Sequence, residues 1–383
     1  MNREARDRRE LFLSETSSFA ERLELCAKST RNATFHGESI LLLPGPYECC
    51  AGPVRLLWVA AALPPFHTGG MAGETAATTF ITGADGFIGV ELARILVARG
   101  HQVLGLTPSA EGARRVRRAG ALPVIGDLLE PGQWQDEAAA DWVFHLPPHP
   151  LCKQHVTRRD AESLAQARAA LDSHLLDAVA NGATTRIVYV GDTSGYGTTG
   201  PRAITEDEPP RPSASGLRLT FALDRLDRYV VAGLPIVTAL PGWVYGNGAW
   251  FREHVIDPVM TGRRVRQFGS GGQWVSPIHV NDCVRALLHL AEHGATGSRY
   301  FLVNNEPIRM HEFAGTFARL ADRPLRVWRM PALAAPLVLG PVLAEYILAD
   351  AVFSNIRLRG TGFTFRYPTL EHGLQQILGA LHE

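Results

Sequence analysis

Thr79-Phe-Ile-Thr-Gly-Ala-Asp-Gly-Phe-Ile-Gly89 is the stretch of sequence that decides the fold. It begins as a short apolar strand, passes through a glycine-rich turn and continues as a helix. Gly83 permits the tight turn, Gly86 leaves room for a phosphate beside the backbone, and Gly89 allows the helix to pack closely on the strand. Such a turn presents the unpaired N–H groups of a helix N-terminus. The stretch therefore predicts a dinucleotide-binding site.

Strands and helices alternate along the chain from this turn onward, which is typical of a parallel sheet covered by helices on both faces. The short apolar runs predict strands over 79–82, 102–106, 122–125, 142–146, 186–191 and 235–240, and the intervening patterns predict helices over 87–99, 110–118, 159–181 and 217–232. We therefore expect an α/β fold, a Rossmann-type doubly wound parallel sheet with a smaller C-terminal substrate lobe. Ligands of such sheets bind at the carboxyl ends of the strands.

Three parts of the chain differ in character. Residues 1–70 show no sustained periodicity, and we expect a poorly ordered N-terminal extension or a misassigned start. Residues 71–250 are expected to form the nucleotide-binding domain and 251–383 the substrate lobe, with 273–293 returning to the first domain. The apolar segment 331–353 is interrupted by prolines and acids. It predicts a helix pair that lines or covers a pocket, and a monotopic membrane contact is the alternative.

Composition limits the partners. The chain is 46% hydrophobic and 20% charged, with 38 basic residues against 38 acidic ones, so nothing in the overall charge suggests nucleic acid or an anionic membrane as a partner. No apolar run is long and uninterrupted enough to predict a membrane span. Five cysteines without metal-ligand spacing favour free thiols, no metal site and a cytoplasmic setting.

Six ordered blocks resemble the extended short-chain dehydrogenases/reductases of the NAD-dependent epimerase/dehydratase type. The likeness covers roughly 79–380. The blocks are the phosphate loop Thr82–Gly89, the turn Gly126–Leu128, the strand Val143–Leu146, the strand and loop Arg186–Gly197, the nicotinamide-side loop Pro241–Gly246 and the segment Ser276–Asp282. The resemblance implies an NAD(P)-dependent enzyme and allows a homodimer paired through the helices near 159–181 and 217–232.

The catalytic residues depart from this family's pattern. The family uses a tyrosine with a lysine four residues later, and these positions fall on Gly216 and Thr220 here. Where the family has a serine or threonine to hold the substrate oxygen, this chain has Asp192, followed by Thr193. Asp192 is therefore the candidate substitute acid, with Thr193 as a hydrogen-bonding neighbour; Asp192 as an ordinary turn residue is the alternative.

The resemblance also assigns the candidate cofactor-binding residues. They are Gly83, Asp85, Gly86, Phe87, Ile88, Gly89, Thr107, Asp127, Leu128, Leu146, Pro241 and Val244. The second predicted strand ends without the acid that usually holds the ribose hydroxyls of NAD, and Arg114 and Arg115 follow it. This favours NADP over NAD. His145, at the end of a predicted buried strand, is interpreted as a hydrogen-bonded core histidine.

The sequence thus favours an oxidoreductase or epimerase/dehydratase-like enzyme with a non-standard catalytic set. Its substrate is expected to be a small, apolar carbonyl or hydroxyl compound, because aromatic residues such as Phe251, Trp274 and Trp328 are available to line a pocket. Two alternatives stay open. One is a dinucleotide-binding sensor without catalysis, and the other is a non-redox isomerase, cyclase or lyase on the same scaffold.

Overall fold

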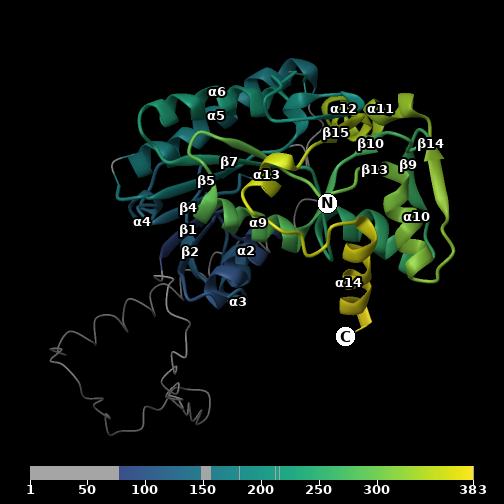
Figure 1. Ribbon diagram of the computed structural model, residues 1–383, viewed down its shortest axis with the longest axis horizontal. Helices are drawn as coiled ribbons and strands as arrows, with labels where there is room; N and C mark the ends of the chain where they lie inside the picture. The colour runs from purple at the N-terminus through teal and green to yellow at the C-terminus, as the bar shows by residue number, and fades with distance from the viewer. Residues whose placement is uncertain (1–76, 148–156, 181, 212, 215, 383) are drawn as a thin grey trace, which may run out of the picture. The chain divides into compact units, whose positions relative to one another are not determined.

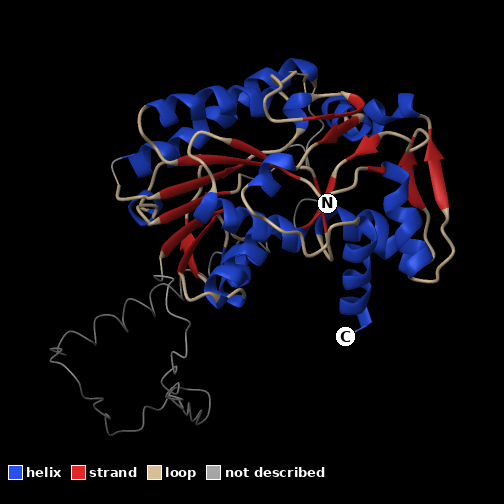
Figure 2. Ribbon diagram, in the orientation of Figure 1, coloured by secondary structure: helices blue, strands red, loops and turns tan. Residues whose placement is uncertain are grey.

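A seven-stranded parallel sheet forms the centre of the computed structural model, which describes residues 77–147, 157–180, 182–211, 213–214 and 216–382 (Figures 1 and 2). Its strands are β1 (Thr78–Thr82), β2 (Gln102–Thr107), β3 (Leu122–Ile125), β4 (Trp142–His145), β5 (Arg186–Val190), β7 (Ile236–Pro241) and β12 (Arg299–Leu302). Their order is β12-β7-β5-β4-β1-β2-β3. The order reverses between β1 and β4, where a dinucleotide site is expected.

Two groups of helices cover the two faces of this sheet (Figure 1). One face carries α2 (Phe87–Ala98), α3 (Ala110–Arg118) and α9 (Val280–His293), and the other carries α5 (Arg158–Ala180), α6 (Leu217–Val231) and the short α4 (Trp134–Glu137). The inner strands of the sheet are buried from both sides, as Phe80, Ile81 and Phe144 illustrate at 0% exposure, whereas the edge strand β3 is partly exposed. This double burial explains why the strands are continuous apolar runs in the sequence.

The smaller lobe has its own core, in which Phe251, Phe313 and Phe317 pack edge to face. Its helices are α7 (Ala249–Phe251), η3 (Arg252–Ile256), α8 (Asp257–Met260), α10 (Met310–Leu320), η4 (Ala332–Ala334), α11 (Ala335–Leu339), α12 (Pro341–Leu348) and α14 (Leu370–His382). Outside it, α13 (Ile356–Gly360) adjoins β12, and η2 (Ser194–Tyr196) is a single turn after β5.

Four two-stranded sheets complete the described part of the chain. They pair β6 (Gly200–Ile204) with β15 (Ala351–Phe353), β8 (Trp243–Tyr245) with β11 (Pro277–His279), β9 (Val265–Phe268) with β14 (Val327–Met330), and β10 (Trp274–Val275) with β13 (Ile308–Arg309).

The predicted doubly wound α/β fold is confirmed, and the six predicted strands and four predicted helices agree with the structure to within a residue or two. The seventh strand, β12, was missed. It is four residues long and lies in a region predicted to belong to the lobe, so the chain returns to the main sheet beyond residue 293. The segment 331–353 forms the expected helix pair, α11 and α12, which Gly340 separates in a left-handed conformation (φ +81°).

Candidate functional site

The glycine-rich turn between β1 and α2 is closed by backbone contacts that exclude any side chain at two of its glycines. A Cβ on Gly83 would lie 2.2 Å from the carbonyl oxygen of Leu146, and one on Gly89 would lie 2.2 Å from the carbonyl oxygen of Gly83. Gly83 also has φ +63°. No side chain caps the N-terminus of α2, where Gly86 is the exposed N-cap residue. The free N–H groups of this 12-residue helix suit an anion such as a pyrophosphate.

Thr107 and Asp85 lie beside this turn, on either side of Gly112. A Cβ on Gly112 would lie 1.9 Å from Thr107 Oγ1 and 2.5 Å from Asp85 Oδ2, so the glycine makes room for both. Thr107 Oγ1 is buried and has no hydrogen-bond partner among the described groups. Arg115 of α3 lies 3.6 Å from Asp85 Oδ2. The Arg115 guanidinium and the Thr107 hydroxyl, which has no hydrogen-bond partner among the described groups, therefore lie at the end of β2, where the ribose of a dinucleotide is expected.

The other predicted cofactor residues lie at the same edge of the sheet. The turn that holds Asp127 is attached to β2, because Gly126 N–H donates to the Thr107 carbonyl; Asp127 itself is exposed and accepts from Leu129 N–H. Phe87 packs against Gly246 and Gly248 beyond β8. Of the remaining positions, Leu128, Leu146 and Pro241 are buried, and Ile88 and Val244 are half-buried. The binding of a cofactor by these residues stays a prediction.

A buried hydrogen-bonded chain links the end of β1 to β4, α5 and β5. Thr82 Oγ1 lies 2.7 Å from His145 Nδ1, and His145 Nε2 lies 3.0 Å from Asp172 Oδ1. Asp172 also accepts from Arg168 Nε at 2.9 Å and from the Tyr189 hydroxyl at 2.7 Å. The interpretation of His145 as a hydrogen-bonded core histidine agrees with this geometry. No sequence pattern singles out its partner Asp172, because that residue lies 27 positions away on a helix.

The protonation states of these hydrogen-bonded side chains follow from their geometry. Burial lowers the pKa of His145, so the imidazole is neutral near pH 7. Burial disfavours charge on Asp172, but Arg168 and the hydrogen bonds from His145 and Tyr189 outweigh it and lower the pKa of this carboxyl. The carboxylate can only accept, so His145 Nε2 carries the proton and Nδ1 accepts from the Thr82 hydroxyl. Thr82 Oγ1 in turn accepts from Leu146 N–H, which fixes β4 against the turn that begins at Gly83.

The loop after β5 contains the two predicted catalytic residues. Asp192 is half-buried, and its Oδ1 accepts from Ser194 N–H at 2.8 Å, which makes a local turn. Thr193 is buried. Sequence reasoning passed over Ser194, whose buried hydroxyl has no hydrogen-bond partner among the described groups. Nothing in the geometry excludes Asp192 as an acid, and its role stays a prediction.

Backbone from this loop packs against Gly216, the position at which the sequence comparison with the family predicts the tyrosine. A Cβ on Gly216 would lie 2.5 Å from the carbonyl oxygen of Ser194 and 2.8 Å from Cα of Gly195. Gly216 is the N-cap residue of α6, and Thr220 Oγ1 donates to the Gly216 carbonyl at 3.3 Å. The tyrosine–lysine pair is thus absent from the sequence, and its site is closed by packing.

Aromatic side chains form one wall next to the nicotinamide-side loop. Trp243 stacks on Tyr346 of α12, with ring centroids 5.2 Å apart, and meets Trp250 edge to face at 5.3 Å. Glu345, the neighbour of Tyr346, pairs with Arg158 at the start of α5. Helix α12 therefore closes over β8 and joins the lobe to the nucleotide-binding domain.

Other residues considered in the sequence have structural roles. His279 is the N-cap residue of α9 and accepts from Asn281 N–H, whereas Asp282 accepts from Arg366 N–H and Tyr367 N–H and so anchors the C-terminal segment. Burial raises the pKa of the Tyr245 hydroxyl far above its usual range.

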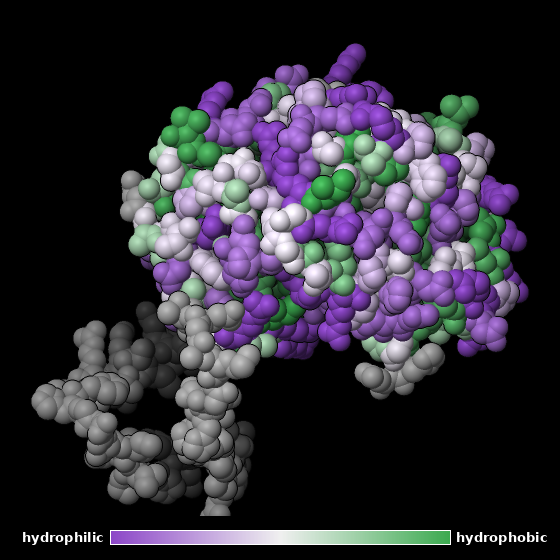
Figure 3. Space-filling model, viewed as in Figure 1, coloured by the Kyte–Doolittle hydropathy of each residue, from purple (hydrophilic) through white to green (hydrophobic). Residues whose placement is uncertain are grey.

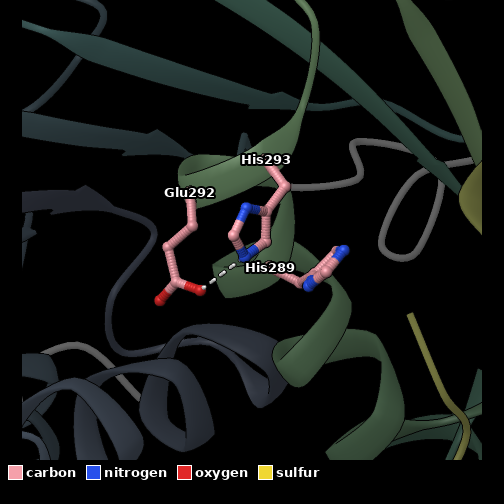
Figure 4. Close-up of side chains that lie close together, drawn as sticks. All are labelled: His289, Glu292 and His293. Atoms are coloured by element: carbon pink, nitrogen blue, oxygen red, sulfur yellow. Dashed lines mark ion pairs between the residues drawn. The ribbon is translucent and has the colours of Figure 1, made fainter. Parts of the chain in front are cut away.

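One group of potential metal ligands occurs among the described residues, on the last turns of α9 (Figure 4). His293 faces Glu292, with 3.6 Å between Nε2 and Oε2. Arg99 also binds Glu292 at 2.9 Å, and His289 Nε2 lies 2.8 Å from Thr361 Oγ1. A metal ion there would have to displace Arg99, so the cluster is explained by its existing hydrogen bonds and ion pairs.

Together, the sheet order and the uncapped glycine turn define an extended short-chain dehydrogenase/reductase-like protein. Residues 79–303 match the family described as the NAD-dependent epimerase/dehydratase family, and the chain belongs to this family.

Curated relatives include a ketoreductase. The 4-hydroxy-2-methyl-3-oxo-4-farnesyl-3,4-dihydroquinoline-1-oxide ketoreductase of Stigmatella aurantiaca is 27% identical over 292 residues, which cover 73% of this chain and 84% of the relative. An epimerase family protein of Staphylococcus saprophyticus is 38% identical, over 29% of this chain and 37% of the relative.

Solved structures share the fold at lower identity. The UDP-glucose 4-epimerase of Thermotoga maritima with UDP-glucose has a TM-score of 0.67 at 16% identity, covering 80% of this chain and 98% of that one. The human epimerase family protein SDR39U1 with NADPH has a TM-score of 0.65 at 21% identity, covering 79% and 99%.

We expect the protein to lose stability in mild acid. Burial lowers the pKa of His279 to about 4, and burial also lowers the pKa of His145. The unfolded chain therefore takes up more protons below pH about 6.5, so stability falls as the pH falls from there. At pH 5 protonation of the unfolded state at His279 alone costs about 2 kcal/mol of stability, and His145 shifts stability in the same direction. Urea unfolding at pH 7.5 and pH 5 measures this, and His279→Asn, which keeps an N-cap acceptor without titrating, should remove part of the difference. An unchanged difference in this variant would contradict the assignment.

Gly216→Ala should destabilise the protein by about 1–3 kcal/mol, because its Cβ would meet backbone on two sides. Gly315→Ala in α10, where a Cβ meets nothing within 4 Å, is the matched control and should not destabilise. For the same reason, Gly216→Tyr combined with Thr220→Lys should destabilise the protein at least as much as Gly216→Ala. Equal urea midpoints for Gly216→Ala and wild type would show that the loop moves aside freely.

Proposed function

We propose that the protein is an NAD(P)-dependent oxidoreductase that reduces the carbonyl group of a small apolar compound. The observation that carries the proposal is the turn from Gly83 to Gly89, in which Gly83 and Gly89 admit no Cβ and no side chain caps the N-terminus of the following helix. These free N–H groups fit the pyrophosphate of a dinucleotide. Membership of the NAD-dependent epimerase/dehydratase family supports the same cofactor class.

The chemistry divides between the cofactor and the chain. A bound reduced nicotinamide would supply the hydride for the carbonyl carbon. The chain has to hold the carbonyl oxygen and give it a proton. In the loop after β5, Thr193 and Ser194 carry hydroxyls that can hold an oxygen, and Asp192 is the group that can deliver a proton. This role requires Asp192 to be protonated when the substrate binds.

The proposed substrate is apolar and ring-containing. The wall of Trp243, Trp250 and Tyr346 offers flat apolar surfaces beside the nicotinamide-side loop. The relative from Stigmatella aurantiaca is by its name a ketoreductase of a farnesylated dihydroquinoline oxide. Both observations favour an aromatic or prenylated ketone over a sugar nucleotide.

The preferred cofactor is proposed to be NADP(H). Thr107 ends β2 without a carboxylate for the ribose hydroxyls, and the Arg115 guanidinium lies beside the turn, 3.6 Å from Asp85. The human relative was solved with NADPH, which agrees with this preference. Asp85 works against it, because its carboxylate would share Arg115 with a 2′-phosphate.

A second candidate is a dinucleotide-binding protein without turnover. The closed site at Gly216 favours it, because the usual proton relay cannot be restored without moving the backbone of Ser194 and Gly195. A non-redox isomerase, cyclase or lyase would instead form product with no change in nicotinamide absorbance.

Pairing of two copies through α5 and α6 is a further proposal, which light scattering would test.

Asp192→Asn separates these candidates. The amide can still accept from Ser194 N–H but cannot donate an acidic proton, so kcat for ketone reduction should fall at least about a hundredfold while the Kd for NADPH is unchanged. NADPH binding by fluorescence titration and oxidation of NADPH at 340 nm with a panel of aromatic ketones measure the two quantities. Binding without turnover by wild type would favour the sensor, and failure to bind either dinucleotide would refute the proposal.

Arg115→Ala should weaken NADPH binding about tenfold and leave NADH binding unchanged, since one charge-assisted contact to a phosphate is lost. Arg118→Ala is the matched control, because Arg118 is exposed on the same helix without an ion-pair partner among the described residues. Equal losses for NADPH and NADH would show that Arg115 acts on the fold of the turn and not on cofactor choice.

A further inference from the structure

An exposed apolar surface lies on the outer side of the substrate lobe. Ten large apolar side chains are exposed in the described part of the chain, and five of them fall within residues 325–338. Leu333 is 90% exposed and Leu337 83% exposed. The outer face, as we call it, consists of Leu325, Trp328, Leu333, Leu337 and Val338 together with the exposed arginines 263, 264, 266, 323, 326 and 329.

The residues of the outer face are held together by two paired strands and the helix that follows. β14 pairs with β9 in parallel, so that Trp328 lies opposite Arg266, whose guanidinium is 6.0 Å from the indole ring. Leu333 and Leu337 are four residues apart and lie on one side of η4 and α11. Figure 1 shows β9, β14 and α11 at one end of the lobe, and Figure 3 shows apolar residues alternating with hydrophilic ones along that side.

The outer face is strongly basic. Residues 261–275 and 322–344 contain six arginines and one acid, Asp322, which leaves a net charge of +5. None of the six arginines forms an ion pair within the described residues. A chain that is neutral as a whole thus concentrates unneutralised positive charge where it also exposes leucines and a tryptophan.

We propose that the outer face attaches the protein to the surface of an anionic lipid bilayer. Exposed leucines and a tryptophan enter the headgroup region, and arginines bind anionic headgroups. The attachment is peripheral, because no helix among the described residues is long and apolar enough to cross a bilayer. The proposal does not depend on the reaction proposed above.

Two other partners fit the outer face less well. A second copy of the chain in a two-fold symmetric dimer would bring a net charge of +5 against +5, which already includes the one acid, Asp322, on each copy. A nucleic acid would use the arginines, but it would leave Leu333 and Leu337 without an apolar partner. The lipid surface alone satisfies both the charge and the apolar side chains.

The position of the outer face suggests what membrane attachment would achieve. Helix α12, which follows α11, carries Tyr346 against Trp243 on the inner side of the lobe. Helices α11 and α12 thus have the bilayer on one side and the aromatic wall on the other. A compound dissolved in the membrane would meet the protein next to this wall.

Cosedimentation of the full chain with vesicles tests the proposal. We expect binding to phosphatidylcholine vesicles that contain phosphatidylglycerol, weaker binding to phosphatidylcholine alone, and a decrease with added salt. Leu333→Ser with Leu337→Ser should reduce partitioning about tenfold or more. Arg266→Gln should reduce binding to the anionic vesicles about fivefold, because Arg266 lies on the same side of the strand pair as Trp328. Val231→Ser, which removes an apolar side chain that is 89% exposed at the end of α6, is the matched control and should bind normally.

Three results would overturn the proposal. They are no binding to anionic vesicles, binding that the leucine and arginine variants leave unchanged, and a dimer in light scattering that Leu333→Ser with Leu337→Ser dissociates. The second result would place any membrane contact elsewhere in the chain, and the third would assign the outer face to a second copy. Because the substituted side chains are exposed, equal urea midpoints for all variants should verify that the fold is intact.

Discussion

The hydrogen bond between Thr82 and His145 is the interaction on which the site depends most. It joins the ends of β1 and β4 at the point where the strand order reverses, which is where a doubly wound sheet opens a crevice. Asp172 holds the imidazole from the other side with help from Arg168 and Tyr189. These hydrogen-bonded side chains are all buried, so each of their polar groups needs a hydrogen-bond partner for the sheet to form. Loss of one partner would loosen both strands that support the glycine-rich turn.

The region of the missing proton relay shows how packing and chemistry are linked. In place of a tyrosine side chain, the chain has Gly216 beneath the backbone of Ser194 and Gly195. The loop after β5 occupies the space beside Gly216 into which a side chain would extend. The departure from the family's pattern at Gly216 is therefore accompanied by close backbone packing around that position.

The lobe has two distinct surfaces with different chemistry. Its inner side presents Trp243 and Tyr346 to the edge of the main sheet, and its outer face combines arginines with exposed leucines. Helices α11 and α12 can serve both because Gly340, at φ +81°, breaks the apolar segment into two short pieces of different direction. A continuous helix would have shown one face inward and one outward along its whole length.

The sequence by itself determined the fold and the position of the glycine-rich turn, because buried parallel strands leave continuous apolar runs and the turn requires glycine at fixed spacing. It also showed that the tyrosine and lysine are absent. Only the tertiary structure decided what replaces them. The contact of Gly216 with Ser194, the pairing of His145 with Asp172 and the approach of Arg115 to Asp85 join residues far apart in the chain. The placement of Arg266 beside the exposed Trp328 likewise depends on the pairing of β9 with β14. Periodicity reports which side of an element is buried, but it carries no information about which distant element lies there.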